Sequence, residues 1–223
     1  LPKGDGAEKF IEMMKKSEKI LKEHPVNKAR VEAGKNPATS IWPWGEGTKP
    51  QLDNFYEKYG VKGSVISAVD LIKGIGICAG MKSFDVEGAT GNVHTNYDGK
   101  AQAAIDAFKN GYEYVYVHVE APDECGHRAE LENKVLSVEL IDKKILAPVY
   151  EYLKGCGDDF KIMVLPDHPT PIRIRTHSID PVPFMIYDSR KDVNGVELFC
   201  EESAEAKNNY VPNGYTLMEQ LMK

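Results

Sequence analysis

The sequence is short of the features that mark secreted, membrane-spanning or disulfide-stabilised proteins. Its four cysteines are dispersed and form no CxxC pair, which favours reduced thiols over a disulfide framework or a zinc ribbon. No apolar run approaches the roughly 20 residues that span a bilayer. The N-terminal stretch LPKGDGAEKF contains no apolar core of a signal peptide. We therefore expect a cytoplasmic protein with no membrane partner.

Positively charged residues are also in the minority. The 28 Lys and Arg residues are outnumbered by 34 Asp and Glu, which gives a net charge of -6. This balance argues against non-specific binding to nucleic acid. With 42% hydrophobic and 28% charged residues, the composition is that of a globular domain. The chain begins without methionine and enters a helical pattern at once, so we expect it to be a piece of a longer protein.

What the sequence does contain, from Pro50 onward, is an alternation of strand and helix patterns. Such alternation predicts an α/β fold with a mostly parallel sheet and helices on both faces. In sheets of this kind, ligands bind at the carboxyl ends of the strands. The expected strands are 63–69, 112–120, 160–166 and 182–188. The expected helices are 8–23, 51–60, 97–111, 128–155 and 215–223, and 70–81 is expected to be a helix or a turn.

Three local features refine this scheme. His24-Pro25 is expected to end the first helix. Asp98 is expected to cap the helix at 97–111, which Gly111 closes. The Gly- and Pro-rich segment 34–50, with its two tryptophans, is expected to be an ordered connection between two parts of the protein.

Metal-ligating side chains follow two of the expected strands. Asp123 and His127 come after the second strand, in an expected strand-end loop whose backbone Gly126 is expected to loosen. Asp167, His168 and His177 come after the third. Mixed oxygen and nitrogen ligands suit Mn, Zn, Fe or Co better than a lone Mg or Ca site, which prefers oxygen alone.

Each of these pairs also has an ordinary interpretation. Asp-His occurs in turns and helix caps, and a single Asp-x-x-x-His is weak evidence for a metal. Five such residues at two successive strand ends, with only six histidines in the chain, favour a metal site. His118 lies inside an expected strand, so we interpret it as a satisfied core histidine.

Several stretches resemble one family. HVEAPDECGHR and LPDHPTPIRIRTHSIDPVPFMIY resemble the metal-binding motifs of the archaeal-type cofactor-independent phosphoglycerate mutases, which belong to the alkaline phosphatase superfamily of metalloenzymes. NKARVEAGKNPATSIWPWGEG and SVISAVDLIKGIGICAGM resemble other segments of that family. The resemblance runs over nearly the whole chain, and several members of the family carry the label proposed homoserine kinase.

The resemblance implies a three-layer α/β/α alkaline phosphatase-like fold, here partial. Residues 1–49 would be the end of an inserted substrate-binding domain and a linker, and residues 50–223 the C-terminal half of the metal-binding domain. Two divalent ions are implied, Mn first, with Zn, Co or Mg as alternatives, and no 2,3-bisphosphoglycerate. Asp123, His127 and His177 would bind one ion, while Asp167 and His168 would contribute to the second.

The family is glycolytic and interconverts 3-phosphoglycerate and 2-phosphoglycerate through a phosphoserine intermediate. The resemblance implies that Lys73 is directed at the transferring phosphoryl group, and Arg30 is a candidate for holding the substrate's phosphate or carboxylate. The family's nucleophilic serine, and an aspartate that completes the second metal site, have no match in this chain. We therefore expect the chain to bind metal but not to turn over substrate alone.

Other functions stay open at this point. A phosphotransferase or phosphatase acting on another small phosphorylated compound, such as a homoserine kinase-like enzyme, would share the metal ligands. A non-enzymatic domain would use them as a closed structural site, whereas a catalytic site keeps positions open. A Rossmann-type nucleotide binder is disfavoured because KGIGICAG lacks the third glycine in register. The sequence leaves the oligomeric state open.

Overall fold

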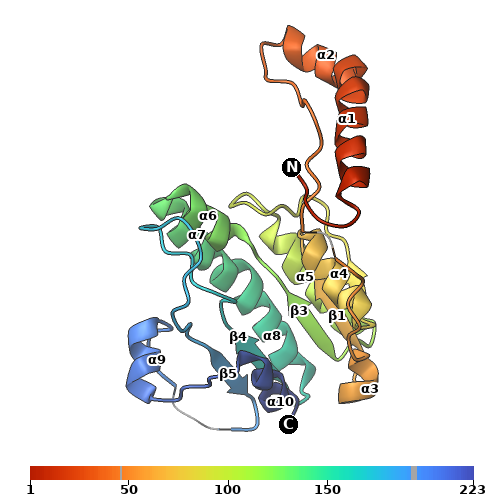
Figure 1. Ribbon diagram of the computed structural model, residues 1–223. Helices are drawn as coiled ribbons and strands as arrows, with labels where there is room; N and C mark the ends of the chain where they lie inside the picture. The colour runs from red at the N-terminus through yellow and green to blue at the C-terminus, as the bar shows by residue number, and fades with distance from the viewer. Residues whose placement is uncertain (46, 192–194) are drawn as a thin grey trace. The chain divides into compact units, whose positions relative to one another are not determined.

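The computed structural model describes residues 1–45, 47–191 and 195–223 (Figure 1). The chain forms two compact units, Leu1–Lys49 and Pro50–Lys223, which are described separately. In the first unit, the expected N-terminal helix is α1, Ala7–Glu23. It ends at His24 as expected, but a second helix, α2 (Pro25–Glu32), begins at once. Proline is tolerated in the first helical turn, and the His24 side chain accepts a hydrogen bond from the Val26 N–H.

Two buried polar side chains tie the segment after α2 back onto the helices. The Asn27 amide nitrogen donates to the carbonyl oxygens of Leu21 (2.8 Å) and Ala38 (2.7 Å), and its oxygen accepts from the Ala38 N–H at 2.9 Å. Ser17 Oγ accepts from the Ile41 N–H at 3.0 Å. These bonds give the Pro-rich segment a defined path without helix or strand.

The second unit is built on a short parallel sheet in the order β2-β1-β3. Strand β1 (Gly63–Ile66) is buried along its length, as expected for a strand covered on both faces. It pairs in parallel with β2 (Lys82–Phe84) and β3 (Tyr114–Val117). Helix α4 (Asp70–Cys78) connects β1 to β2, and α5 (Tyr97–Lys109) precedes β3. The α/β class predicted from the sequence is confirmed.

The remaining two strands depart from a single mostly parallel sheet. β4 (Lys161–Val164) and β5 (Met185–Asp188) form a separate antiparallel pair. No ladder joins β3 to β4 within the described ranges. The reason is local, because β5 follows β4 through the Pro-rich segment 165–184 with no intervening helix. Parallel neighbours are usually joined by a helical crossover, and the structure has no helix in this segment.

Four consecutive helical segments join β3 to β4. After α6 (Ala121–Arg128) come α7 (Leu131–Ile141), a π-helical segment η1 (Asp142–Leu146) and α8 (Ala147–Cys156). The expected helix 128–155 corresponds to the last three. Pro148 has no N–H to donate to the carbonyl of residue 144, so the ladder widens there into the π turn.

The shorter elements complete the unit. Helix α3 (Phe55–Tyr59) is closed by Gly60 at φ 74°, as its sequence indicates. The cap of α5 is Asn96, whose side chain accepts from the Gly99 N–H, so the expectation of an Asp98 cap was wrong. Asp98 instead pairs with Lys144 at 2.8 Å. The C-terminal elements are α9 (Glu201–Lys207), η2 (Gly214–Thr216) and α10 (Leu217–Met222).

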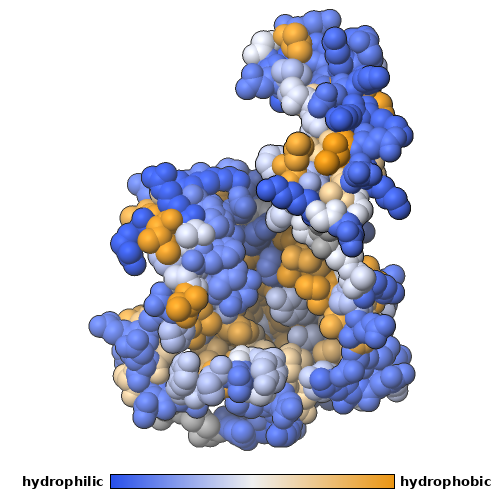
Figure 2. All heavy atoms as spheres, viewed as in Figure 1, coloured by the Kyte–Doolittle hydropathy of each residue, from blue (hydrophilic) through white to orange (hydrophobic). Residues whose placement is uncertain are grey.

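Apolar side chains remain exposed on this unit. Figure 2 shows hydrophobic residues on the visible face of the unit around a hollow, with hydrophilic residues at its periphery. On α4, Leu71 and Ile77 are 70% and 60% exposed. In the part of the chain that the structure describes, no helix combines the length and apolarity needed to cross a membrane.

Two glycines in α4 give a matched stability prediction. A Cβ at Gly76 would lie 2.6 Å from Cγ1 of Val65, which is buried in β1, whereas no described atom lies within 4 Å of a Cβ at Gly74. We expect Gly76→Ala to lower the free energy of unfolding by about 1–2 kcal/mol, because overpacking outweighs helix propensity. Gly74→Ala should raise it by up to about 1 kcal/mol. Urea unfolding of both variants measures this, and equal signs would contradict the packing argument.

Candidate metal centre

The first pair of candidate ligands lies on a helix rather than in a loop. Helix α6 begins four residues after β3 ends, with Pro122 in its first turn, where proline is favourable. The expectation of a strand-end loop was therefore wrong for Asp123 and His127. Their separation of four residues places both side chains on one face of α6.

The third ligand arrives from the segment that follows β4. In Figure 1 this cyan segment runs back beside α6. The Oδ2 atom of Asp123 lies 3.3 Å from His127 Nε2, and its Oδ1 atom lies 3.3 Å from His177 Nε2. The two Nε2 atoms are 3.2 Å apart. One ligand atom from each of the three residues lies within 4.8 Å of the others, which is a geometry that could hold one metal ion.

The contacts around His127 fit the donor set of a divalent ion. Its Nδ1 atom lies 3.0 Å from the carbonyl oxygen of Arg175, which can only accept, so Nδ1 carries the proton. Nε2 then has a free lone pair, and this atom faces Asp123 and His177. Metal-binding histidines commonly use this arrangement. Arg175 itself has φ 54°, in the left-handed region that non-glycine residues rarely adopt.

The other two candidate ligands lie against this triad. The His168 ring lies against that of His177, with centroids 3.7 Å apart and the planes tilted by 33°, and its Nδ1 atom is 4.0 Å from Asp123 Oδ1. Asp167 Oδ2 is 3.4 Å from His168 Nε2, and the Asp167 side chain is 64% exposed. The structure thus brings all five residues into one continuous cluster, with Asp123 at its centre.

A buried lysine and a half-buried glutamate flank the cluster. The Lys100 side chain is fully buried, and its ammonium donates to the carbonyl oxygen of His118 at 2.8 Å. Burial lowers the pKa of Lys100 to about 8. The pKa of Glu120 is raised, first by burial and second by the negative charge of the neighbouring Glu124. The imidazole of His118 lies 3.2 Å from Ser67 Oγ, and burial lowers its pKa, in agreement with the structural role expected for it.

The two basic candidates have their recorded polar contacts with other residues. Lys73, on α4, forms an ion pair with Asp85 at 2.7 Å, and within the described ranges its polar contact is with that residue rather than with the cluster. Arg30 belongs to the Leu1–Lys49 unit, where its Nε atom donates to the carbonyl oxygen of Asn36 at 3.0 Å.

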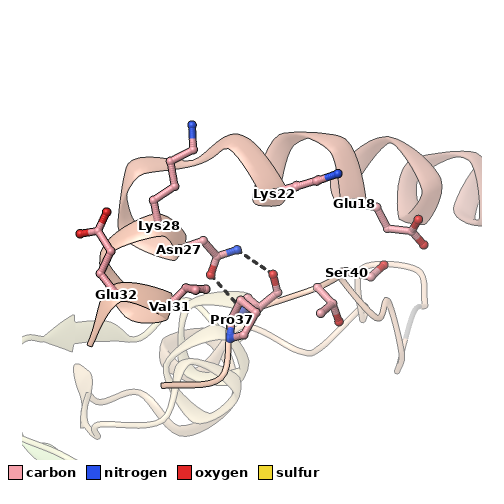
Figure 3. Close-up of a pocket in the computed structure, with 10 residues that line it drawn as sticks. Glu18, Lys22, Asn27, Lys28, Val31, Glu32, Pro37 and Ser40 are labelled. Atoms are coloured by element: carbon pink, nitrogen blue, oxygen red, sulfur yellow. Dashed lines mark hydrogen bonds between the residues drawn. The ribbon is translucent and has the colours of Figure 1, made fainter. Parts of the chain in front are cut away.

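That unit also contains a cavity of about 620 Å³, between the helices and segment 37–40. Figure 3 shows Lys22, Lys28 and Glu32 among its lining residues, and the amide of Asn27 bonded to the backbone. That amide is already engaged, and among the described residues the group of candidate metal ligands is Asp123, His127 and His177, none of which lines this cavity.

Two residues at or beside the cluster were not identified from the sequence. Thr170 Oγ1 donates to Asp123 Oδ1, and Lys134 Nζ donates to the carbonyl oxygens of Pro122 and Thr170. The position of Thr170 between Pro169 and Pro171 was a usable signal, since prolines hold such a loop in shape. Lys134 carries no local signal, because an amphipathic helix has many lysines.

Comparison with known proteins identifies the class. A family model described as the metalloenzyme superfamily matches residues 10–211, and the chain belongs to that superfamily. The chain is 47% identical over 223 residues to the probable 2,3-bisphosphoglycerate-independent phosphoglycerate mutase of Geobacter sulfurreducens, covering 100% of this chain and 55% of the relative. It is 52% identical over 206 residues to the 2,3-bisphosphoglycerate-independent phosphoglycerate mutase of Methanosarcina mazei, covering 92% of this chain and 52% of the relative.

Solved structures show the same relationship. The PH0037 protein from Pyrococcus horikoshii superposes with a TM-score of 0.74 at 30% identity, over 90% of this chain and 52% of that one. The cofactor-independent phosphoglycerate mutase from Thermoplasma acidophilum gives 0.56 at 28% identity, over 97% and 51%. The resemblance noted in the sequence is confirmed, as is the partial α/β fold. The chain spans about half the length of the relatives it matches.

Proposed function

We propose that the chain is part of a metal-dependent, cofactor-independent phosphoglycerate mutase, an isomerase that interconverts 3-phosphoglycerate and 2-phosphoglycerate through a phosphoserine intermediate. The observation that carries the proposal is the cluster of Asp123, His127 and His177, in a chain whose relatives are named for this activity. Because the chain spans about half of those relatives, we assign the activity to a longer protein that includes it. The inserted substrate-binding domain would end within residues 1–49.

In this proposal, Asp123, His127 and His177 hold one divalent ion, and Asp167 and His168 contribute to a second. Manganese suits the mixed donors, with zinc, cobalt or magnesium as alternatives, and no 2,3-bisphosphoglycerate is required. When bound, the ions supply positive charge that neutralises the phosphoryl oxygens.

The residues of the chain then have separate tasks. The Arg175 carbonyl keeps His127 in one tautomer. The half-exposed His177, at 51%, leaves the cluster open to a small phosphorylated substrate. Lys73 supplies a mobile ammonium for the transferring phosphoryl group. Its present partner, Asp85, is 89% exposed, and ion pairs with such exposed partners are weak enough to exchange. Arg30 offers a planar fork for the substrate's phosphate or carboxylate.

We also propose a cytoplasmic location. The four cysteines are free thiols in the structure, which a reducing compartment preserves. Fractionation of the source cells with an antibody to the protein would test this.

The proposal is tested by a paired assay on the full-length protein with Mn²⁺. We expect 2-phosphoglycerate to form from 3-phosphoglycerate, without release of free phosphate in the same tube. Formation should cease on chelation, return with added Mn²⁺, and be lost in His177→Ala. Phosphate release without isomerisation would favour a phosphatase instead. The 223-residue chain alone should bind Mn²⁺ without turnover, and turnover by it would contradict a nucleophile outside this chain.

A further inference from the structure

A lysine on α7 joins the two segments that carry the candidate ligands. The half-buried Lys134 donates to the carbonyl oxygen of Pro122 at 2.9 Å and to that of Thr170 at 3.1 Å. Pro122 precedes Asp123 on α6, and Thr170 lies two residues beyond His168. One ammonium therefore bonds to the backbone of both segments, through charge-assisted hydrogen bonds that are stronger than neutral ones.

Thr170 connects this backbone bridge to the candidate ligands themselves. It is 5% exposed, and while its carbonyl accepts from Lys134, its hydroxyl donates to Asp123 Oδ1. Its Oγ1 atom also lies 3.3 Å from His168 Nδ1. A hydroxyl bonded to one carboxylate oxygen limits the rotation of that carboxylate, so Thr170 helps to orient Asp123.

Gly126 permits this close approach. It is a buried residue within α6, and a Cβ there would overlap the Thr170 carbonyl oxygen and lie 3.0 Å from Lys134 Nζ. The expectation that Gly126 loosens the backbone was therefore wrong. Its backbone is helical, and what the glycine provides is space for Thr170 and Lys134.

We propose that Lys134, Thr170 and Gly126 form a clamp that holds segment 165–178 in register with α6, and thereby sets the affinity of the centre for a divalent ion. The affinity part of this inference rests on the proposed function. Lys134 is a positioning residue, since it reaches the ligands only through the backbone and Thr170. Loss of an outer partner of a metal ligand typically weakens metal binding by about 10- to 100-fold.

The test compares Lys134→Met with wild type in the full-length protein that contains this chain. Calorimetric titration with Mn²⁺ should show about 10- to 100-fold weaker binding in the variant. In EDTA, amide hydrogen exchange should become faster in residues 121–128 and 165–178 and stay unchanged in β1. The matched control is Lys143→Met, which changes an exposed lysine in η1 and should leave both measurements as in wild type.

A second pair of variants separates positioning from general stability. Thr170→Val removes the hydroxyl at nearly constant volume, whereas Thr170→Ser keeps it. We expect about tenfold weaker Mn²⁺ binding for the valine variant and near wild-type binding for the serine variant. Equal affinities in the two, together with faster exchange throughout Lys134→Met, would overturn the clamp.

The outcomes distinguish the clamp from the proposed function. If wild type and Lys134→Met bind Mn²⁺ equally and exchange alike, the clamp is wrong while the metal centre stands. If wild type fails to bind Mn²⁺ but Lys134→Met loosens the two segments in EDTA, the proposed function fails. The clamp then stands as a device that positions the segments.

Discussion

We expect Asp123→Asn to weaken Mn²⁺ binding by at least about 100-fold, or roughly 2.7 kcal/mol. Among the described residues, Asp123 contacts all three histidines of the cluster, namely His127, His168 and His177. Its carboxylate lies 3.3 Å from both His127 Nε2 and His177 Nε2, and it accepts from Thr170 Oγ1. Asparagine keeps the shape but removes the negative charge that a hard divalent ion requires.

The matched control is Glu124→Gln. It removes the same charge one residue away on α6, where the side chain pairs with Arg128 and is not among the three candidate ligands. We expect its Mn²⁺ affinity to stay within about twofold of wild type, since exposed pairs of this kind contribute little. Calorimetric titration measures both variants. Equal losses would mean that general negative charge, rather than ligation by Asp123, attracts the ion.

The second large effect concerns Lys100. Its folded-state pKa of about 8 lies below its ordinary 10.5, so near pH 7 the fold carries the cost of a buried charge. A shift of this size corresponds to about 3 kcal/mol. Lys100→Met removes that cost but leaves the His118 carbonyl without its donor, a loss of about 1 kcal/mol. We therefore expect the free energy of unfolding of Lys100→Met to be about 2 kcal/mol higher than that of wild type near pH 7.

The pH dependence provides the check. Between pH 8 and 10.5 the unfolded chain retains a proton on Lys100 that the folded chain has released, so wild-type stability gains on the variant as the pH rises. The advantage of Lys100→Met should therefore be complete below pH 8, decrease as the pH rises, and reverse above about pH 10.5 to a deficit of about 1 kcal/mol, the cost of the lost donor. Tyrosines that titrate in this range affect both proteins and cancel in the difference. A difference in unfolding free energy that is flat with pH would show that Lys100 is not buried as a charge.

Much of the architecture was predictable because it is encoded locally. The burial of β1 is indicated by its adjacent β-branched, apolar residues Val65 and Ile66, and Gly60 ends α3 because a left-handed residue is needed there. The candidate ligands were recognisable because they follow strands in stretches that resemble a metalloenzyme family.

What could not be predicted depends on contacts between distant residues. The sequence does not reveal that, among the described strands, β4 pairs with β5 and not with β3, because the pattern of a strand does not specify which strand lies beside it. Helix α6 was missed because a glycine within eight residues suggests a loop, and only the packing of Thr170 explains that glycine. Lys134 was missed for the same reason, since its partner Thr170 lies 36 residues away.

The order of the ligands along the chain has a consequence for the sequence of events in folding. Asp123 and His127 meet within one helical turn, whereas His127 and His177 are 50 residues apart. Closing a loop of that length costs on the order of 3 kcal/mol in chain entropy. The pair on α6 can therefore form early, but the triad waits until β4 and its return segment have assembled. Chains that refold from the unfolded state should therefore acquire tight metal binding in a late, slow phase.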